Sequence, residues 1–112
     1  MEWTVADIGN GVTLVELSGR MDVAGALKAD PALADIASNN TRVIVDLSQV
    51  GFLASLGIRT LVTTSKTLRS KEGNLVLLSP QPNVEQVLHS SGIDTIIPIA
   101  TDRAAAEASV LE

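Results

Sequence analysis

Residues 43–62 read VIVDLSQVGFLASLGIRTLV, and this stretch decides the fold class. It opens on the largely β-branched run 43–47, which is typical of a central strand that is covered on both faces. We expect a loop at 48–54 and then a helix that begins after Ser55, because apolar residues return there at the i, i+3, i+4 spacing of an amphipathic helix. A buried strand followed at once by a helix is the repeating unit of an α/β fold.

The predicted helix keeps its charged residues away from its apolar stripe. The stripe consists of Ile58, Leu61, Val62, Ser65 and Leu68, and the cations off it are Arg59, Lys66 and Arg69. The helix should end at the Glu-Gly-Asn segment 72–74.

Upstream of this unit, the sequence predicts an antiparallel hairpin and one helix. The β-rich runs 3–8 and 12–17 flank Gly9-Asn10-Gly11, a tight-turn composition that tolerates positive φ. Residues 18–22 break the strand pattern and lead into an alanine-rich helical region. There Asp30-Pro31 matches an N-cap followed by proline at the first helical position. We therefore expect a helix from residue 31 to Asn39-Asn40, with Leu33, Ile36 and Ala37 on its apolar face.

Downstream, the alternation of strands and helices continues. A buried strand is expected at 75–78 and a short last strand at 96–99. Between them, a third helix should present Val84, Val87, Leu88 and Ser91 on one face and end at Gly92. A final helix opened by Thr101-Asp102 should bury Ala105, Ala108 and Leu111.

These elements predict an α/β fold in which a hairpin precedes alternating strands and helices. Such alternation favours right-handed crossovers and a mostly parallel sheet with helices packed on it. No linker or repeat divides the 112 residues, so we expect a single domain over 1–112. The sequence leaves open whether the domain is a monomer or a weak dimer.

Composition excludes several classes of function. The chain has no cysteine, so disulfides, thiolate metal sites and cysteine nucleophiles are excluded. Its net charge of −5 does not supply the basic surplus that nucleic-acid binding needs, and we expect no nucleic-acid partner. With no signal-peptide pattern and no apolar run of membrane-spanning length, the sequence predicts a cytoplasmic protein that does not bind membranes.

The sequence also predicts that the protein is not an enzyme and that it holds no cofactor and no metal ion. His89 is the only histidine and lies just past the apolar stripe of its helix, where a solvated side chain is expected rather than a general base. The aspartates show no calcium-loop or paired-carboxylate spacing. A glycine-rich phosphate loop is absent, because residues 51–57 lack its lysine. The missing phosphate loop argues against a domain that binds a small ligand or a nucleotide.

Three segments carry further information, and they lie in the order of the predicted elements. The first is the central stretch, in which a strand ends in Asp46-Leu47-Ser48 and a helix is entered through Ser55-Leu56-Gly57. The second is L-S-G-R-M-D at 17–22, after the second strand, and the third is L-H-S-S-G-I at 88–93, at the helix end before the last strand. All three resemble, in register, the corresponding segments of the STAS domain family, and the resemblance covers essentially the whole chain.

The resemblance implies an anti-sigma factor antagonist. In such systems the unphosphorylated STAS protein binds a serine kinase that is also the anti-sigma factor, and this binding releases the sigma factor. Phosphorylation of one serine by that kinase ends the binding, and a PP2C-type phosphatase restores it. Ser55 falls on the phosphoacceptor position, and the implied partner-binding residues are Asp22, Ala54, Ser55, Leu56, Gly57 and Arg59.

Several of these residues also have structural interpretations. Ser55 could act as the N-cap of its helix, and Asp22 as a turn or cap residue. Gly57 permits close packing, either within the domain or against a partner backbone. Leu56 should point outward if the helical stripe is correct, which would make it an interface anchor.

The sequence departs from the family pattern on both sides of Ser55. Many members carry an aspartate before the phosphoacceptor and a serine or threonine after it, whereas this chain has Ala54 and Leu56. This departure leaves open a second hypothesis, a STAS scaffold that is never phosphorylated. Such a scaffold would be a subunit of a larger complex, for example a stressosome-like or lipid-transport assembly.

Overall fold

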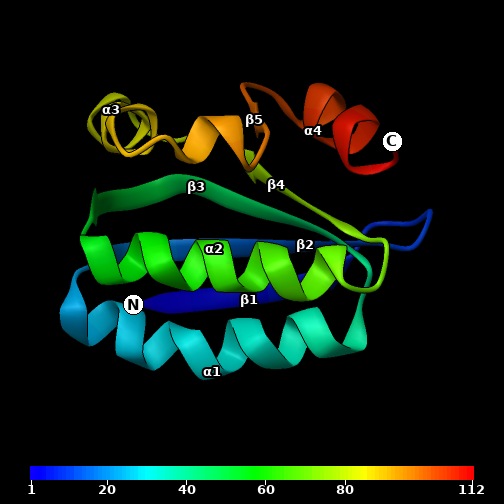
Figure 1. The fold of residues 1–112 in the computed structure, drawn as a ribbon, viewed down its shortest axis with the longest axis horizontal. Coiled ribbons are helices and arrows are strands. Elements are labelled where there is room, and N and C mark those ends of the chain that lie inside the picture. Colours follow the sequence, from blue (N-terminus) through cyan, green and yellow to red (C-terminus); the bar gives the residue numbers. More distant parts are fainter.

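A computed structural model describes residues 1–112 and arranges them around a five-stranded sheet (Figure 1). The strands are β1 (Glu2–Asp7), β2 (Val12–Met21), β3 (Arg42–Leu53), β4 (Asn74–Leu78) and β5 (Ile99–Ala100). The helices are α1 (Val23–Asn39), α2 (Ser55–Arg69), α3 (Pro82–Ser90), the short 3-10 helix η1 (Ile93–Thr95) and α4 (Arg103–Val110). The strand order is β1-β2-β3-β4-β5, with β1 antiparallel to β2 and all other neighbours parallel. The predicted α/β fold with a mostly parallel sheet is thus confirmed.

Each face of the sheet has its own apolar core, because successive side chains of a strand point to opposite faces. On β3, Val43, Val45 and Leu47 join the large core, which also holds the buried apolar side chains of α1, α2 and α3. Ile44, between them, joins a smaller core that α4 covers with Ala106 and Val110. Figure 1 shows α1 and α2 side by side, with α4 on the other side of the central strands.

Both central strands are longer than predicted. β2 continues to Met21 and β3 to Leu53, so the expected break at 18–22 and the expected loop at 48–54 are wrong. The two strands pair as far as Met21 and Leu53, with register shifts between Glu16 and Ser18 and between Gly19 and Arg20. Gly19 accommodates this irregularity with a φ of 114°. Residues that look like strand breakers therefore lie in a bulged parallel ladder.

Because β2 extends to Met21, α1 begins earlier than predicted. Its N-cap is Asp22, whose carboxylate accepts a hydrogen bond of 2.8 Å from the backbone N–H of Gly25. The expected start at Asp30-Pro31 is wrong, since Pro31 lies inside the helix on its exposed side. The carbonyl group that loses its partner to proline can be hydrated there. The predicted buried residues Leu33, Ile36 and Ala37 are confirmed.

The C-terminal elements differ from the sequence prediction in detail. The last strand is Ile99–Ala100 instead of 96–99, because η1 and the turn after it occupy the preceding residues. Asp102 caps α4 as expected, and its side chain accepts a 2.8 Å hydrogen bond from the Ala105 N–H. The predicted apolar face of α4 is wrong. The helix buries Ala106 and Val110 instead of the expected Ala105, Ala108 and Leu111.

Replacement of Asp22 tests its role in holding the start of α1. Asp22→Ala should lower the free energy of unfolding by about 1 kcal/mol through loss of the N-cap hydrogen bond. For a domain of this size, that corresponds to a fall in Tm of roughly 4 °C. Asp22→Asn keeps a side-chain oxygen acceptor and should leave Tm close to the wild-type value in calorimetry. An equal loss in both variants would contradict the capping role.

Candidate functional site

The junction between β3 and α2 is a single residue, Ala54. Strand β3 ends at Leu53 and α2 begins at Ser55. The Ala54 N–H donates a 2.9 Å hydrogen bond to the carbonyl of Met21, the last residue of β2. This bond fixes the helix start against the end of the neighbouring strand.

Ser55 is the first residue of α2, and its side chain is free. The N-cap position belongs to Ala54, which has extended backbone angles and no capping side chain, so the structural prediction that Ser55 is the N-cap is wrong. Ser55 is exposed, and its hydroxyl takes part in none of the side-chain hydrogen bonds of the domain. The hydroxyl is therefore available to another molecule.

The electrostatic setting of Ser55 favours an anion. The first turn of α2 contains no acidic residue, and the first backbone N–H that bonds back into the helix is that of Ile58, to the Ala54 carbonyl at 3.1 Å. The preceding N–H groups carry the partial positive charge of the helix N-terminus. A shallow groove beside Ser55 is lined without acids by Ser55, Ile58, Asn83, Gln86, Val87, Ser90 and Ser91.

Asp22 lies at the end of β2, directly after the residue that binds Ala54. One carboxylate oxygen caps α1, and the other is 3.8 Å from the Arg20 side chain. The Arg20 guanidinium lies 4.5 Å from the centre of the Phe52 ring, its pairing partner on β3. The ends of β2 and β3 thus bring a carboxylate, a cation and a half-exposed ring to the edge that holds Ser55.

Gly57 is buried and packs within the domain. A Cβ atom added there would lie 2.8 Å from Leu53 Cδ1, 2.9 Å from Met21 Cγ and 3.2 Å from the Met21 carbonyl oxygen. Glycine is therefore needed for α2 to approach the ends of both strands. This accords with the close-packing interpretation and leaves a partner only indirect contact with Gly57.

Leu56 and Arg59 lie in a second groove, between α1 and α2. Leu56 is half-buried against the large core, so its predicted outward orientation is only partly correct. Arg59 is exposed on the rim. The groove is lined by Leu27, Asp30, Leu56, Arg59, Thr60 and Thr63.

Two exposed apolar residues of α1 were missed by sequence reasoning. Val23 is 59% exposed and Leu27 63% exposed, and both belong to the first turns of α1. The sequence prediction placed them before the helix, because Asp30-Pro31 was the stronger start signal. The interpretation of Asp22 as a cap residue is the signal that points to them, and it is confirmed, since Asp22 is the N-cap of α1.

Helix α3 supports the other side of the junction. The Asn83 amide donates a 2.8 Å hydrogen bond to the Gly51 carbonyl, and the Gln81 amide donates one of 2.9 Å to the Ser48 carbonyl. These bonds anchor the start of α3 to the C-terminal half of β3. They hold the α3 wall of the groove beside Ser55, and the bond from Ala54 to Met21 holds the start of α2, its other wall.

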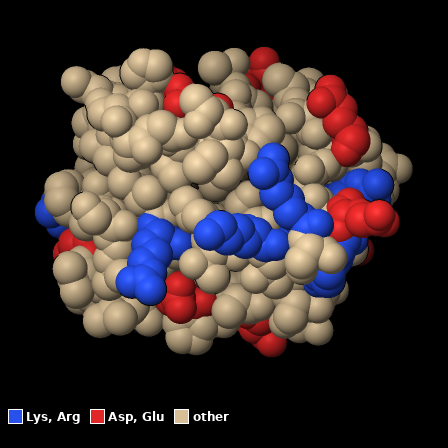
Figure 2. Space-filling view, viewed as in Figure 1, with Lys and Arg blue, Asp and Glu red and all other residues tan.

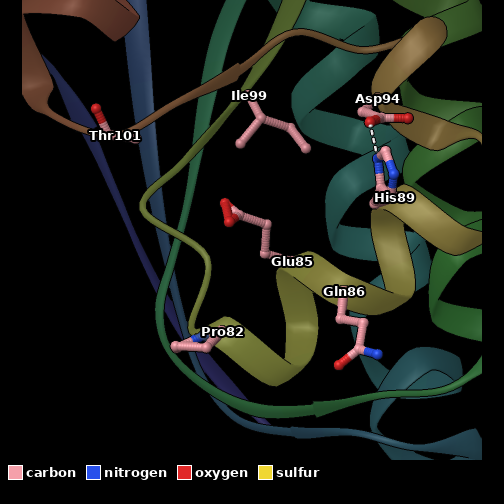
Figure 3. Close-up of a pocket in the computed structure, with 7 residues that line it drawn as sticks. All are labelled: Pro82, Glu85, Gln86, His89, Asp94, Ile99 and Thr101. Carbon is pink, nitrogen blue, oxygen red and sulfur yellow. Dashed lines mark hydrogen bonds and ion pairs between the residues drawn. The ribbon is translucent and has the colours of Figure 1, made fainter.

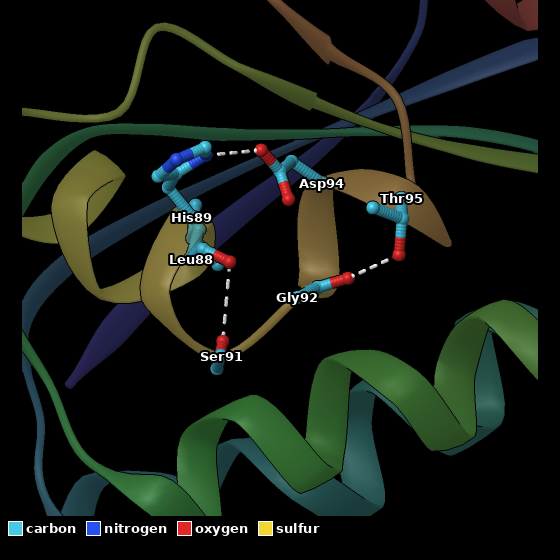
Figure 4. A network of polar contacts seen from close by, with 6 residues as sticks. All are labelled: Leu88, His89, Ser91, Gly92, Asp94 and Thr95. Carbon is cyan, nitrogen blue, oxygen red and sulfur yellow. Dashed lines mark hydrogen bonds and ion pairs between the residues drawn. The ribbon is translucent and has the colours of Figure 1, made fainter.

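His89 lies away from this junction and forms no catalytic array. It is exposed and its Nδ1 lies 2.6 Å from an Asp94 oxygen, within a shallow pocket that Glu85 and Thr101 also line (Figure 3). The neighbouring hydroxyls of Ser91 and Thr95 bind backbone carbonyls instead of the imidazole (Figure 4). The hydrogen bond to Asp94, then its charge and that of Glu85, raise the pKa of His89 above 6.5, against a smaller opposing effect of desolvation.

The domain has neither a metal-binding cluster nor a membrane-spanning helix. No group of three or more His, Cys, Asp or Glu side chains is placed to hold a metal ion. None of the helices combines the length and apolar character required to cross a membrane.

Comparison with known proteins gives a consistent result. Residues 4–106 match the family model of the STAS domain. The putative anti-sigma factor antagonist BtrV of Bordetella bronchiseptica is 33% identical over 101 residues, which cover 89% of this chain and 87% of BtrV.

Solved structures agree with this match. The crystal structure of an anti-sigma factor antagonist from Mycobacterium paratuberculosis superposes with a TM-score of 0.89 at 27% identity, covering 99% of this chain and 94% of that one. The phosphorylated form of Bacillus SpoIIAA shares the fold, with a TM-score of 0.73. Its sequence is 18% identical, and the match covers 96% of this chain and 99% of that one.

Replacement of Gly57 tests the close packing behind the junction. Gly57→Ala should lower the free energy of unfolding by about 1–3 kcal/mol, because Met21 and Leu53 must move to admit the methyl group. Gly51→Ala is the matched control, since a Cβ there meets nothing within 4 Å. Urea denaturation of both variants measures the difference, and equal stability of the two would contradict this account.

Replacement of Asp94 tests the cause of the His89 shift. Asp94→Asn should lower the pKa of His89 toward 6.5, and Glu85→Gln should lower it less. Since the folded pKa is raised, the pair stabilises the domain below about pH 6.5 and this contribution is lost as pH rises through the folded value. NMR titration of the imidazole measures both shifts, and an unchanged pKa in Asp94→Asn would refute the assignment.

Proposed function

The chain belongs to the STAS domain family, and we propose that it is an anti-sigma factor antagonist switched by phosphorylation of Ser55. In this proposal the unphosphorylated chain binds a serine kinase that is also the anti-sigma factor. Phosphate transfer to Ser55 ends the binding, and a PP2C-type phosphatase restores it. The domain acts on its partner by binding, not as an enzyme, in the cytoplasm where sigma factors work.

The observation that carries the proposal is the unengaged Ser55 hydroxyl. It is exposed at the first position of α2, and it forms no hydrogen bond with another group of the domain. A serine kept for capping would use its oxygen on the N–H groups of the first turn. Here the backbone of Ala54, held by Met21, sets the helix start without help from the serine.

A phosphate at this position would leave the fold intact. It adds a charge of about −1.5 to −2 at neutral pH. The unpaired N–H groups of the helix start favour that charge, and the acid-free first turn does not repel it. Loss of partner binding would then come from bulk and charge across the interface, not from unfolding.

The proposed partner surface surrounds Ser55. It comprises Asp22 at the end of β2, Ala54 at the junction, and Leu56 and Arg59 on α2, with Gly57 acting from beneath through the packing it allows. The exposed side chains of Val23 and Leu27 on α1 extend this surface with apolar area. An apolar centre with a polar rim is the usual composition of a specific protein interface.

A second candidate function rests on Ala54. A kinase that recognises an acid before the serine would find none here, since Ala54 and the acid-free first turn flank Ser55. The domain would then be a constitutive STAS scaffold in a larger assembly, which is never phosphorylated.

Incubation with a serine kinase of the anti-sigma type and ATP separates the two functions. We expect mass spectrometry to find phosphate on Ser55, and Ser55→Ala to remain unmodified. Ser55→Asp should weaken kinase binding at least tenfold in calorimetry, whereas the uncharged and equally shaped Ser55→Asn should bind close to wild type. Tm should change little, because an exposed substitution usually costs under about 0.5 kcal/mol. A chain that binds the kinase but takes no phosphate, with Ser55→Asp binding unchanged, would support the scaffold instead.

A further inference from the structure

The charged side chains of α2 are all of one sign. Between Ser55 and Arg69 the helix carries Arg59, Lys66 and Arg69 and no acidic residue. The whole chain is acidic, with 13 Asp and Glu against 8 Lys and Arg. Figure 2 shows Lys and Arg side chains in a row across the face over α2. We name Arg59, Lys66 and Arg69 the basic stripe.

The basic stripe begins at Arg59, about one helical turn after Ser55. Arg59 lies four residues after the serine, and Lys66 lies seven residues after Arg59, spacings that put all three on one side of the helix. Arg69 follows one turn later, and each residue of the stripe is exposed. At 1.5 Å per residue, the distance along the axis from Ser55 to Arg69 is about 21 Å. The serine therefore lies at the N-terminal end of a straight line of cations.

No cation of the stripe forms an ion pair within 4 Å, although the acidic Asp30 lines the same groove as Arg59. The ion pairs of the structure are Arg20–Asp22, His89–Asp94 and Arg103–Glu107. Lys71, the next cation along the chain, differs because its Nζ donates hydrogen bonds to the carbonyls of Ala37 and Asn40 at the end of α1. Lys71 therefore has hydrogen-bond partners within the domain, whereas the side chains of the stripe have none.

Helix stability alone does not account for the stripe. Lys66 and Arg69 lie in the last turn of α2, where the helix dipole favours cations. Arg59 is the fifth residue of α2, far from the last turn, so the helix dipole does not account for it. A cation at that position, with no acid in the first turn, instead fits an anionic group outside the domain.

We propose that the basic stripe docks an acidic surface of the kinase partner, and that a phosphate on Ser55 weakens this docking by cancelling charge at the head of the stripe. The inference rests on the proposed function and names the chemistry of the partner. The formal charge of α2 is +3, and a phosphate of about −1.5 to −2 reduces it to roughly +1 to +1.5. The switch therefore acts on the long-range attraction as well as on the contact at Ser55.

The surroundings of the stripe favour a protein over a membrane as the occupant. The groove that Leu27 and Leu56 line runs beside Arg59, so an apolar contact lies next to the charged rim. Attraction to an anionic bilayer grows with the number of cations near its surface, and three cations on a chain of net charge −5 give little. An acidic surface on a protein can contact all three cations if it extends along the length of α2.

Charge reversal with a matched control tests the docking. Lys66→Glu changes the stripe, and Lys28→Glu makes the same charge change on α1, at an exposed residue outside the α1–α2 groove. Binding of the full chain to the kinase is measured by stopped flow at several salt concentrations. We expect Lys66→Glu to slow association at least fivefold and to flatten its salt dependence, while Lys28→Glu stays near wild type. Circular dichroism verifies that both variants fold.

Three outcomes would overturn the inference, and they are distinguishable. If the wild-type chain forms no complex with the kinase, the proposed function and the docking stripe both fail. If the complex forms and both variants associate like wild type, the function stands and the stripe plays no part in it. If Lys66→Glu leaves kinase binding unchanged but abolishes binding to vesicles that contain phosphatidylglycerol, the stripe is a membrane contact.

Discussion

The pairing of β2 with β3 out to Met21 and Leu53 is the constraint on which the rest of the structure depends. These two residues end their strands side by side, and each is buried in the large core. The Met21 carbonyl accepts the Ala54 N–H, and Asp22, one residue later, caps α1. One strand pair therefore determines where both α1 and α2 begin.

The candidate functional site follows from this arrangement. Because the backbone of Ala54 is held by Met21, α2 starts at Ser55 without a capping side chain, and the serine hydroxyl remains unused. Gly57 brings the helix against the strand ends at distances that a Cβ would make too short. The scaffold beneath the serine is closely packed, whereas the serine itself is exposed. Such a division lets a modification alter binding with little cost to the fold.

The two sides of α2 have separate tasks. Its buried side, with Leu61 and Leu68, belongs to the large core. Its exposed side carries cations that form no ion pair within the domain. Surface charges of this kind contribute little to stability, so they can be set by the needs of a partner. The partner proposed here would recognise α2 by the Ser55 hydroxyl, by Leu56 and by the basic stripe.

The sequence alone determined the α/β class, the buried strands around Val45 and Leu77, the amphipathic character of α2 and the placement of Ser55 at a helix start. Local periodicity and family resemblance suffice for such features. Only the tertiary structure decided that β2 reaches Met21, that Asp22 rather than Asp30 begins α1, and that Ala54 rather than Ser55 is the N-cap of α2. The glycine and polar residues at 18–22 and 48–54 favour loops when considered locally. Pairing between the two strands supplies their hydrogen bonds, and that energy comes from residues distant in the sequence.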